Sequence, residues 1–365
     1  MNSTEACIAL NMLRLMGPVR LRNLLQVFGA PENVLTARRD QLRAIDGIGN
    51  DVAEEILKWE STVDLTGELE RIRQFGARVI TAGSSEYPRL LREIHAPPIV
   101  LYVWGDLQQR DQHAIGIIGA RRTTHYGSES AKKLAYQLAY AGLTIVSGLA
   151  RGIDTAAHQG AIAAKGRTIA VIGSGLGKLY PPENAALADK IRSGNGAIVS
   201  EFSMEVEPDR QTFPMRNRII SGWSQGILVV EAGLNSGALI TAAQAVEQGR
   251  SVYAVPGHIN APSAMGSNRL IQQGAKLVMD ASDVLDDLQI LLPEAQPIAR
   301  AARPLPELST SERVVYDAID SSETAIDAIA ARCNLPTGAI SSTLLRLELK
   351  RLVKQLPGKF FVKLA

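Results

Sequence analysis

Two arginines and an asparagine, Arg216, Asn217 and Arg218, lie near the start of a predicted helix that follows a predicted strand. The segment reads Phe213-Pro214-Met215-Arg216-Asn217-Arg218-Ile219-Ile220. Guanidinium groups bind phosphate oxygens in pairs, and the first turn of a helix adds N–H donors that have no partner within the helix. A helix that begins at the edge of an α/β sheet is also a common phosphate site. These residues therefore predict a site that binds an anion.

Other cations follow the neighbouring predicted strands. They are Arg121 and Arg122 after the strand 114–119, Arg151 after the strand 143–147, and Lys178 after the strand 168–173. Because parallel strands end at one edge of a sheet, we expect these side chains to surround one basic pocket together with Arg216 and Arg218. Ser236 and Gly237 begin a further predicted helix, where small residues let the backbone approach a phosphate or a neighbouring strand. Several cations around one pocket favour a polymeric anion.

Short β-rich runs alternate with helical runs between residues 113 and 280. The predicted strands are 114–119, 143–147, 168–173, 197–201, 227–231, 251–255 and 276–278. Such alternation predicts the α/β class, with an extended Rossmann-like sheet that is doubly wound and mostly parallel. Open sheets of this kind bind ligands at the carboxyl ends of their strands, which is where the cations lie.

Three domains and a linker are predicted along the 365 residues. They are a helical domain over 1–80 that is like a sterile alpha motif or a helix-hairpin-helix, the Rossmann-like domain over 81–292, a proline-rich linker over 293–308 and a winged-helix domain over 309–365. The turn Gly47-Ile48-Gly49 either lets backbone N–H groups approach a DNA phosphate or only connects two helices. Acidic residues around this turn leave both alternatives open.

The last predicted domain carries the clearest basic cluster of the chain. Ser309 and Glu312 predict a capping box at the start of its first helix. Further helices are expected over 325–333 and 337–353, followed by a short strand. The cations of the cluster are Arg346, Lys350, Arg351, Lys354, Lys359 and Lys363. Winged helices bind DNA or other proteins, so either partner is compatible with this pattern.

Composition limits the classes of function. The formal net charge is only +2, so any nucleic-acid surface has to come from local clusters of cations. Cys7 and Cys333 lie far apart, and neither they nor the five histidines show metal-ligand spacing, so no cofactor or metal is predicted. The amino-terminal region lacks a basic segment followed by an apolar run, and no stretch approaches the ~20 apolar residues of a membrane span. We therefore expect a cytoplasmic protein without membrane contact.

Nucleotide-binding and catalytic motifs are incomplete. The turn after the strand 114–119 lacks Gly-x-Gly-x-x-Gly spacing, and Arg151 stands where an NAD site needs an acidic residue. The glycine-rich segment 173–178 lacks the Lys-Ser/Thr pair of a Walker loop. Asp154 and His158 are four residues apart, which favours an orienting hydrogen bond inside the fold over catalysis. The sequence therefore predicts a binding protein and no enzyme.

An ordered series of short segments spans roughly residues 85–287. The segments are Tyr87-Pro88, Pro97-Pro98, Gly119-Ala120-Arg121, Ser147-Gly148-Leu149-Ala150-Arg151-Gly152-Ile153-Asp154, Ala157-His158, Tyr180-Pro181 with Asn184, Ser200-Glu201, Phe213-Pro214-Met215-Arg216-Asn217-Arg218, Glu231-Ala232, Ser236-Gly237 with Thr241-Ala242, and Val255-Pro256-Gly257. In these residues and their order the chain resembles the DNA-processing protein A family, also called DprA or Smf, of bacterial natural transformation.

This resemblance implies a recombination mediator that binds single-stranded DNA without strong sequence preference, forms a homodimer and helps to load the recombinase RecA. Arg121 matches the family's DNA-binding arginine, and Arg216 and Arg218 match its arginine-rich helix start. The chain departs from the family after Tyr180-Pro181, where many members have a lysine that touches DNA and this chain has Pro182.

Two alternatives remain. One is a nucleotide phosphoribohydrolase of the lysine-decarboxylase-like group, whose sheet is related. That group needs a Pro-Gly-Gly-x-Gly-Thr turn before a catalytic glutamate, and here the corresponding segment reads Glu231-Ala232-Gly233-Leu234-Asn235-Ser236-Gly237. The other is repression through the winged helix, which would bind duplex DNA.

Overall fold

The computed structural model describes residues 1–291, 308–319, 324–333, 335–350, 352–356 and 358–363. The chain divides into two compact units between Ile298 and Ala299. Residues 293–307 of the predicted linker lie outside the described residues. In the part of the chain that is described, no helix is both long and apolar enough to cross a bilayer.

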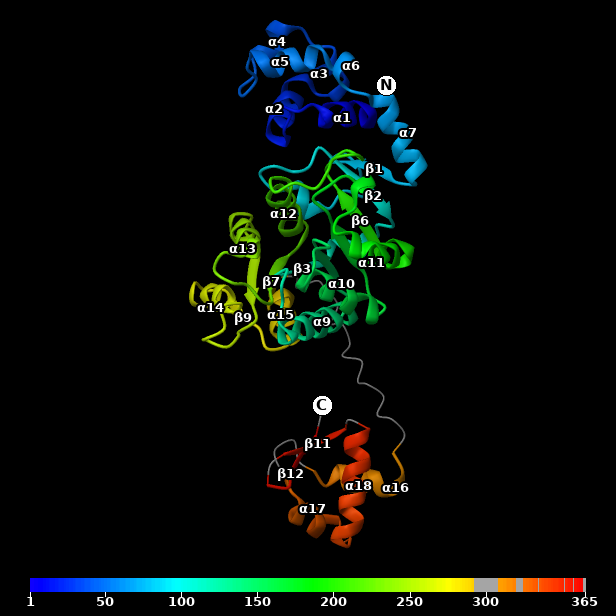
Figure 1. The fold of residues 1–365 in the computed structure, drawn as a ribbon, viewed down its shortest axis with the longest axis vertical. Coiled ribbons are helices and arrows are strands. Elements are labelled where there is room, and N and C mark those ends of the chain that lie inside the picture. The colour runs from blue at the N-terminus through cyan, green and yellow to red at the C-terminus, as the bar shows by residue number, and fades with distance from the viewer. Residues whose placement is uncertain (292–307, 320–323, 334, 351, 357, 364–365) are drawn as a thin grey trace. The chain divides into compact units, whose positions relative to one another are not determined.

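A nine-stranded sheet forms the centre of the first unit (Figure 1), in the order β1-β2-β6-β5-β4-β3-β7-β8-β9. The strands are β1 (Arg78–Thr81), β2 (Val100–Gly105), β3 (Ala114–Ile118), β4 (Thr144–Ser147), β5 (Thr168–Val171), β6 (Gly196–Ser200), β7 (Gly226–Val229), β8 (Ser251–Ala254) and β9 (Lys276–Leu277). Strands β3 to β9 pair in parallel, whereas β1 and β2 are antiparallel additions at one edge. The predicted mostly parallel sheet is confirmed, and β1 and β2 were not predicted.

Helices cover both faces of this sheet, which explains why every residue of β3 to β7 is buried. On β3, Ile115 and Ile117 pack with α9 (His125–Tyr140) and α10 (Ile153–Ala163). Ile118 packs on the opposite face, with α12 (Thr212–Trp223) and α13 (Gly237–Glu247). Shorter helices complete the two layers: α8 (Arg89–Arg92), α11 (Ala185–Lys190), α14 (Met265–Gln272), α15 (Ala281–Leu291), η1 (Gln109–Gln112), η2 (Leu176–Lys178), η3 (Pro182–Asn184) and η4 (Ile191–Asn195).

The amino-terminal helices share a hydrophobic core with the sheet. They are α1 (Ser3–Met12), α2 (Pro18–Phe28), α3 (Pro31–Leu35), α4 (Arg39–Arg43), α5 (Asn50–Leu57), α6 (Trp59–Thr62) and α7 (Leu65–Phe75). The buried Glu68 of α7 accepts a hydrogen bond from the Met204 N–H at 2.8 Å, and Asn11 Nδ2 donates to the Glu201 carbonyl at 2.9 Å. The domain boundary at residue 80 stays a prediction, because these contacts run across it. Phosphate binding by the turn around Gly47 also stays a prediction.

The second unit has the predicted winged-helix order. Its elements are α16 (Thr310–Asp317), β10 (Thr324–Ala325), α17 (Ile326–Cys333), α18 (Thr337–Leu349), β11 (Val353–Leu356) and β12 (Phe360–Lys363). The capping box of Ser309 and Glu312 is present, and Lys350 Nζ lies 2.8 Å from Glu312 Oε2. Arg346 is exposed on α18, whereas Arg351 and the side chain of Lys354 lie outside the described residues.

A buried ion pair joins loops at the amino-terminal edge of the sheet. Arg167 Nε and Nη2 each donate to the carboxylate of Asp111 at 2.7 Å, and both side chains are only 3% exposed. Asp111 also accepts a hydrogen bond from Thr144 Oγ1 at 2.8 Å. Because Asp111 precedes β3, Arg167 precedes β5 and Thr144 begins β4, the pair connects three neighbouring strands.

We predict that Asp111→Asn destabilises the first unit by about 3 kcal/mol, since it leaves the buried Arg167 guanidinium with only the exposed carboxylate of Asp106, 3.7 Å away, as a counter-charge. Urea unfolding of the full chain measures this, with Glu70→Gln as the control because it breaks an ion pair on the surface. An Asp111→Asn transition at the wild-type urea concentration would contradict the prediction.

Candidate nucleic-acid interface

The strand order reverses between β3 and β7. From β3 the chain continues through β4 and β5 to β6 on one side, and from β7 it continues to β8 and β9 on the other. Sheets of this kind bind ligands at the carboxyl edge, at the point of reversal. A pocket of about 690 Å³ lies there, between the loop after β3 and the segment that leads from β7 into α13.

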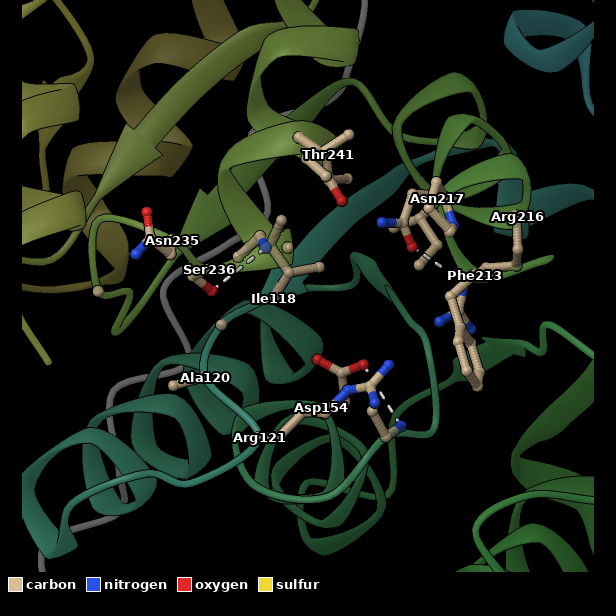
Figure 2. A pocket seen from close by; sticks show the side chains of 18 of the residues that line it. Ile118, Ala120, Arg121, Asp154, Phe213, Arg216, Asn217, Asn235, Ser236 and Thr241 are labelled. Carbon is tan, nitrogen blue, oxygen red and sulfur yellow. Dashed lines mark hydrogen bonds between the residues drawn. The ribbon is translucent and has the colours of Figure 1, made fainter. Parts of the chain in front are cut away.

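Residues from three directions line this pocket (Figure 2). Phe213, Arg216 and Asn217 come from the start of α12, Arg121 from the loop after β3, and Ser236 from the N-cap of α13. Of the nine residues predicted from sequence, six line it: Arg121, Arg122, Arg216, Asn217, Ser236 and Gly237. The Ser236 side chain accepts a hydrogen bond from the Ala238 N–H at 3.3 Å, so α13 begins beside the pocket.

Arg216 is a buried cation with neutral hydrogen-bond partners. Its side chain is only 4% exposed, and Nη1 donates to the Gly148 carbonyl at 2.8 Å and to the Val171 carbonyl. Its Nε donates to Asn217 Oδ1 at 3.2 Å. Burial lowers the pKa of Arg216 to about 10, so the group is protonated at neutral pH. The pocket therefore keeps a positive charge in its wall that no direct ion pair among the described residues cancels.

Asp154 lies near Arg216, in the first turn of α10. Its Oδ2 accepts hydrogen bonds from the Gly148 N–H at 3.1 Å and the Ala150 N–H at 3.4 Å. Gly148 separates the two side chains, because a Cβ there would meet Asp154 Oδ2 at 2.7 Å and Arg216 Cζ at 2.8 Å. Burial raises the pKa of Asp154 to about 6, although the charge of Arg216 and the two N–H donors oppose the rise. Asp154 therefore carries most of its negative charge at pH 7.5 and little at pH 5.

Arg121 lines both the large pocket and a smaller one. Its guanidinium lies over the ring of Phe213, 4.7 Å from the centroid, a geometry of cation–π attraction. Both arginines of the loop, Arg121 and Arg122, line the smaller pocket of about 180 Å³ as well. Arg151 also lines it, but is paired with Glu183 at 2.6 Å. The two pockets share Arg121, Arg122 and Arg216 in their lining, so they form one basic region.

Lys178 and Arg218 line neither pocket. Lys178 Nζ lies 3.2 Å from carboxylate oxygens of both Glu205 and Glu207, and these carboxylates raise its pKa. Arg218 forms a largely buried ion pair with Glu201. Two positions along an α-helix differ by about 200°, so Arg218 faces away from the direction of Arg216. Ligand contact by Lys178 or Arg218 stays a prediction.

Sequence analysis did not identify Arg210, which is exposed and lines the large pocket. It lies two residues before α12 and does not follow a predicted strand directly, so the rule that places ligands at strand ends does not indicate it. The expected hydrogen bond of Asp154 and His158 is also replaced by other partners. His158 Nδ1 lies 2.6 Å from Thr168 Oγ1, and burial lowers the pKa of His158 to about 3.

No group of three or more His, Cys, Asp or Glu in the described residues could hold a metal ion.

We predict that anion affinity rises between pH 7.5 and pH 5, because protonation of Asp154 removes a negative charge beside Arg216. The rise should be about fivefold for one charge at the edge of the pocket. Asp154→Asn should bind more tightly than the wild type at pH 7.5 and equally at pH 5, in a fluorescence titration with an oligo-dT probe. An identical pH profile for both proteins would contradict this role of Asp154.

Comparison with known proteins agrees with this geometry. Residues 78–289 match the family described as DNA recombination-mediator protein A, and residues 299–359 match the DprA winged helix domain. Protein Smf of Synechocystis is 37% identical, over 98% of both chains. The structure of DNA processing protein A from Streptococcus pneumoniae is 34% identical, with a TM-score of 0.68 over 79% of this chain and 99% of that one.

A second similar structure is described as showing how a relative binds single-stranded DNA. It reports the single-stranded DNA binding mode of DNA processing protein A from Helicobacter pylori, which is 28% identical, with a TM-score of 0.53 over 59% of this chain and 96% of that one. Together with the match over more than half of the chain, these relatives show that the protein belongs to the DNA recombination-mediator protein A family, known as DprA or Smf.

Proposed function

We propose that this protein is a single-stranded DNA-binding recombination mediator, and that the pocket between β3 and β7 binds the phosphates of the strand. The observation that carries the proposal is Arg216, a guanidinium that stays charged and buried in the wall of this pocket with neutral partners. A buried charge is costly unless something compensates it. Asp154 lies near Arg216 without forming an ion pair with it, and a bound phosphate supplies a negative charge that can bond to the guanidinium directly. The exposed Arg121, Arg122 and Arg210 extend the same positive region towards solvent.

The lining of the pocket suits a nucleotide better than an isolated phosphate. Apolar side chains stand next to the arginines; they are Ile118, Pro214, Ile220, Leu234 and Ile240. A base can pack on such a wall while its phosphate meets a guanidinium, as in sites that bind single strands without sequence preference. A second pocket beyond Arg121 gives room for a neighbouring nucleotide. Bases enter pockets of this kind only when they are unpaired, so a single strand fits this site better than a duplex.

The finer parts of the proposal rest on family membership. We further propose, as the resemblance to this family implies, that the protein protects incoming strands, helps to load RecA during natural transformation, and acts in the cytoplasm as a homodimer. Light scattering at micromolar concentration tests the homodimer. A strand-exchange assay with RecA tests the loading, and neither assay depends on the assignment of the DNA site.

The phosphoribohydrolase alternative has weaker support. Glu231 lies at the start of the segment that replaces the required turn, whereas the catalytic glutamate of that group follows the turn. It accepts hydrogen bonds from Thr123 and Thr124 and does not line the pocket. Release of ribose 5-phosphate from a nucleoside monophosphate would favour the enzyme. The winged-helix repressor alternative predicts duplex binding that disappears when residues 309–365 are deleted.

We predict that Arg121→Ala weakens binding to oligo-dT about tenfold, because it removes an exposed cation shared by both pockets. The slope of log affinity against log salt should become shallower by about 0.7, the change for one lost phosphate contact on a single strand. Fluorescence anisotropy over a series of salt concentrations measures both quantities.

Arg89→Ala is the matched control, because the Arg89 side chain is 82% exposed on α8 and lines neither pocket. It should leave affinity and slope unchanged. Equal binding of duplex and single strand by the wild type, or an unchanged slope in Arg121→Ala, would contradict the proposed site.

A further inference from the structure

One buried carboxylate holds the loop that carries Arg121 and Arg122. Glu231, two residues after β7, is 4% exposed, and its Oε2 accepts hydrogen bonds from the Thr124 N–H at 2.9 Å and from Thr123 Oγ1 at 2.5 Å. Thr124 Oγ1 is a third donor at 3.2 Å. The main-chain carbonyl of Glu231 accepts from the Ala120 N–H at 2.7 Å. A single residue therefore binds this loop on both sides of its two arginines.

Close packing leaves this loop little freedom to move. A Cβ on Gly119 would lie 2.8 Å from the Glu231 carbonyl oxygen and 2.6 Å from the Ile153 side chain. On the other side, the Ala120 carbonyl accepts a hydrogen bond from the Ile153 N–H at 3.2 Å. The loop is thus held between the segment after β7 and the start of α10, which follows β4; β7 and β4 are the two neighbours of β3 in the sheet.

The carboxylate of Glu231 does not line the pocket but points towards hydrogen-bond donors of Thr123 and Thr124. A Cβ on Gly127 would lie 2.0 Å from Glu231 Oε2, so the carboxylate lies against the first turn of α9, where the helix dipole is positive. Burial opposes ionisation, but hydrogen bonds from Ser263, Thr123 and Thr124 outweigh it and lower the pKa of Glu231. A carboxylate is therefore accommodated close to an anion site without lining the pocket.

We propose that Glu231 is a positioning residue for DNA binding, which acts by holding the loop Gly119–Thr124 so that Arg121 and Arg122 face the pockets. This inference rests on the proposed function of the pocket. Glu231 contacts no ligand in this scheme, so its effect on affinity passes entirely through the two arginines. Without the Glu231 carboxylate, both arginines remain in the chain but sample many orientations. Binding then has to fix their orientation, and this cost in conformational entropy reduces the affinity.

The test measures oligo-dT affinity and its salt slope for the full-length variants Glu231→Ala, Glu231→Gln and Thr123→Val. We expect about tenfold weaker binding and a shallower slope for Glu231→Ala, and smaller losses for the other two because each keeps part of the hydrogen-bond set. The double variant Arg121→Ala/Glu231→Ala should bind almost as well as the weaker of its two single variants, because both changes remove the same contact.

Asp111→Asn is the control for general destabilisation, since Asp111 lies at the opposite edge of the sheet. At a temperature where circular dichroism shows that every variant is folded, Asp111→Asn should bind oligo-dT with the affinity of the wild type. Wild-type binding by Glu231→Ala, or additive losses in the double variant, would overturn the positioning role. If Glu231→Ala does not fold, wild-type affinity and slope in both Glu231→Gln and Thr123→Val would overturn it. If Arg121→Ala itself binds like the wild type, the proposed function of the pocket fails, and the positioning role fails with it.

Discussion

The site depends on one buried interaction, in which the Arg216 guanidinium bonds to the carbonyls of Gly148 and Val171. These carbonyls lie just after β4 and at the end of β5, so the bonds attach the start of α12 to the carboxyl edge of the sheet. They satisfy the two N–H groups of Nη1 but do not neutralise the charge of the guanidinium. Asp154 lies close enough to raise the pKa of Arg216, but it bonds to the N–H groups of Gly148 and Ala150 and forms no ion pair with Arg216. The fold therefore keeps a buried guanidinium whose carboxylate neighbour is directed at other donors, and an entering phosphate can pair with it directly.

Ion pairing divides the cations of this edge into two groups. Arg151, Lys178 and Arg218 each have a carboxylate partner, and the positive field that they offer to a ligand is correspondingly reduced. Among the residues that the structure describes, none forms an ion pair with Arg121, Arg122 or Arg210. This difference explains how a chain with a net charge of only +2 presents a basic pocket. What matters for a polyanion is the number of unpaired cations at one edge.

Much of this arrangement follows from sequence. The alternation of short β-rich runs with helical runs identified β3 to β9, and the rule for parallel sheets located the pocket at their carboxyl ends. Helical periodicity could also have shown that Arg216 and Arg218 point in different directions. Contacts between residues far apart in the chain could not be predicted, because no local pattern indicates them. Lys178 pairs with Glu205, 27 positions away. The Thr124 N–H donates to Glu231, 107 positions away. The edge strands β1 and β2 escaped prediction because each pairs antiparallel, outside the alternating pattern.

The amino-terminal helices connect to the same edge through a chain of short contacts. Glu68 of α7 accepts from the Met204 N–H, and the Met204 carbonyl accepts from the Gly177 N–H at 2.9 Å. A Cβ on Gly175 would lie 2.3 Å from that same carbonyl oxygen, so the loop after β5 and the segment after β6 cannot separate without breaking this packing. That segment leads directly into α12. The helical region thus supports the pocket from a distance, because it holds the segment that determines where Arg210 and Arg216 begin.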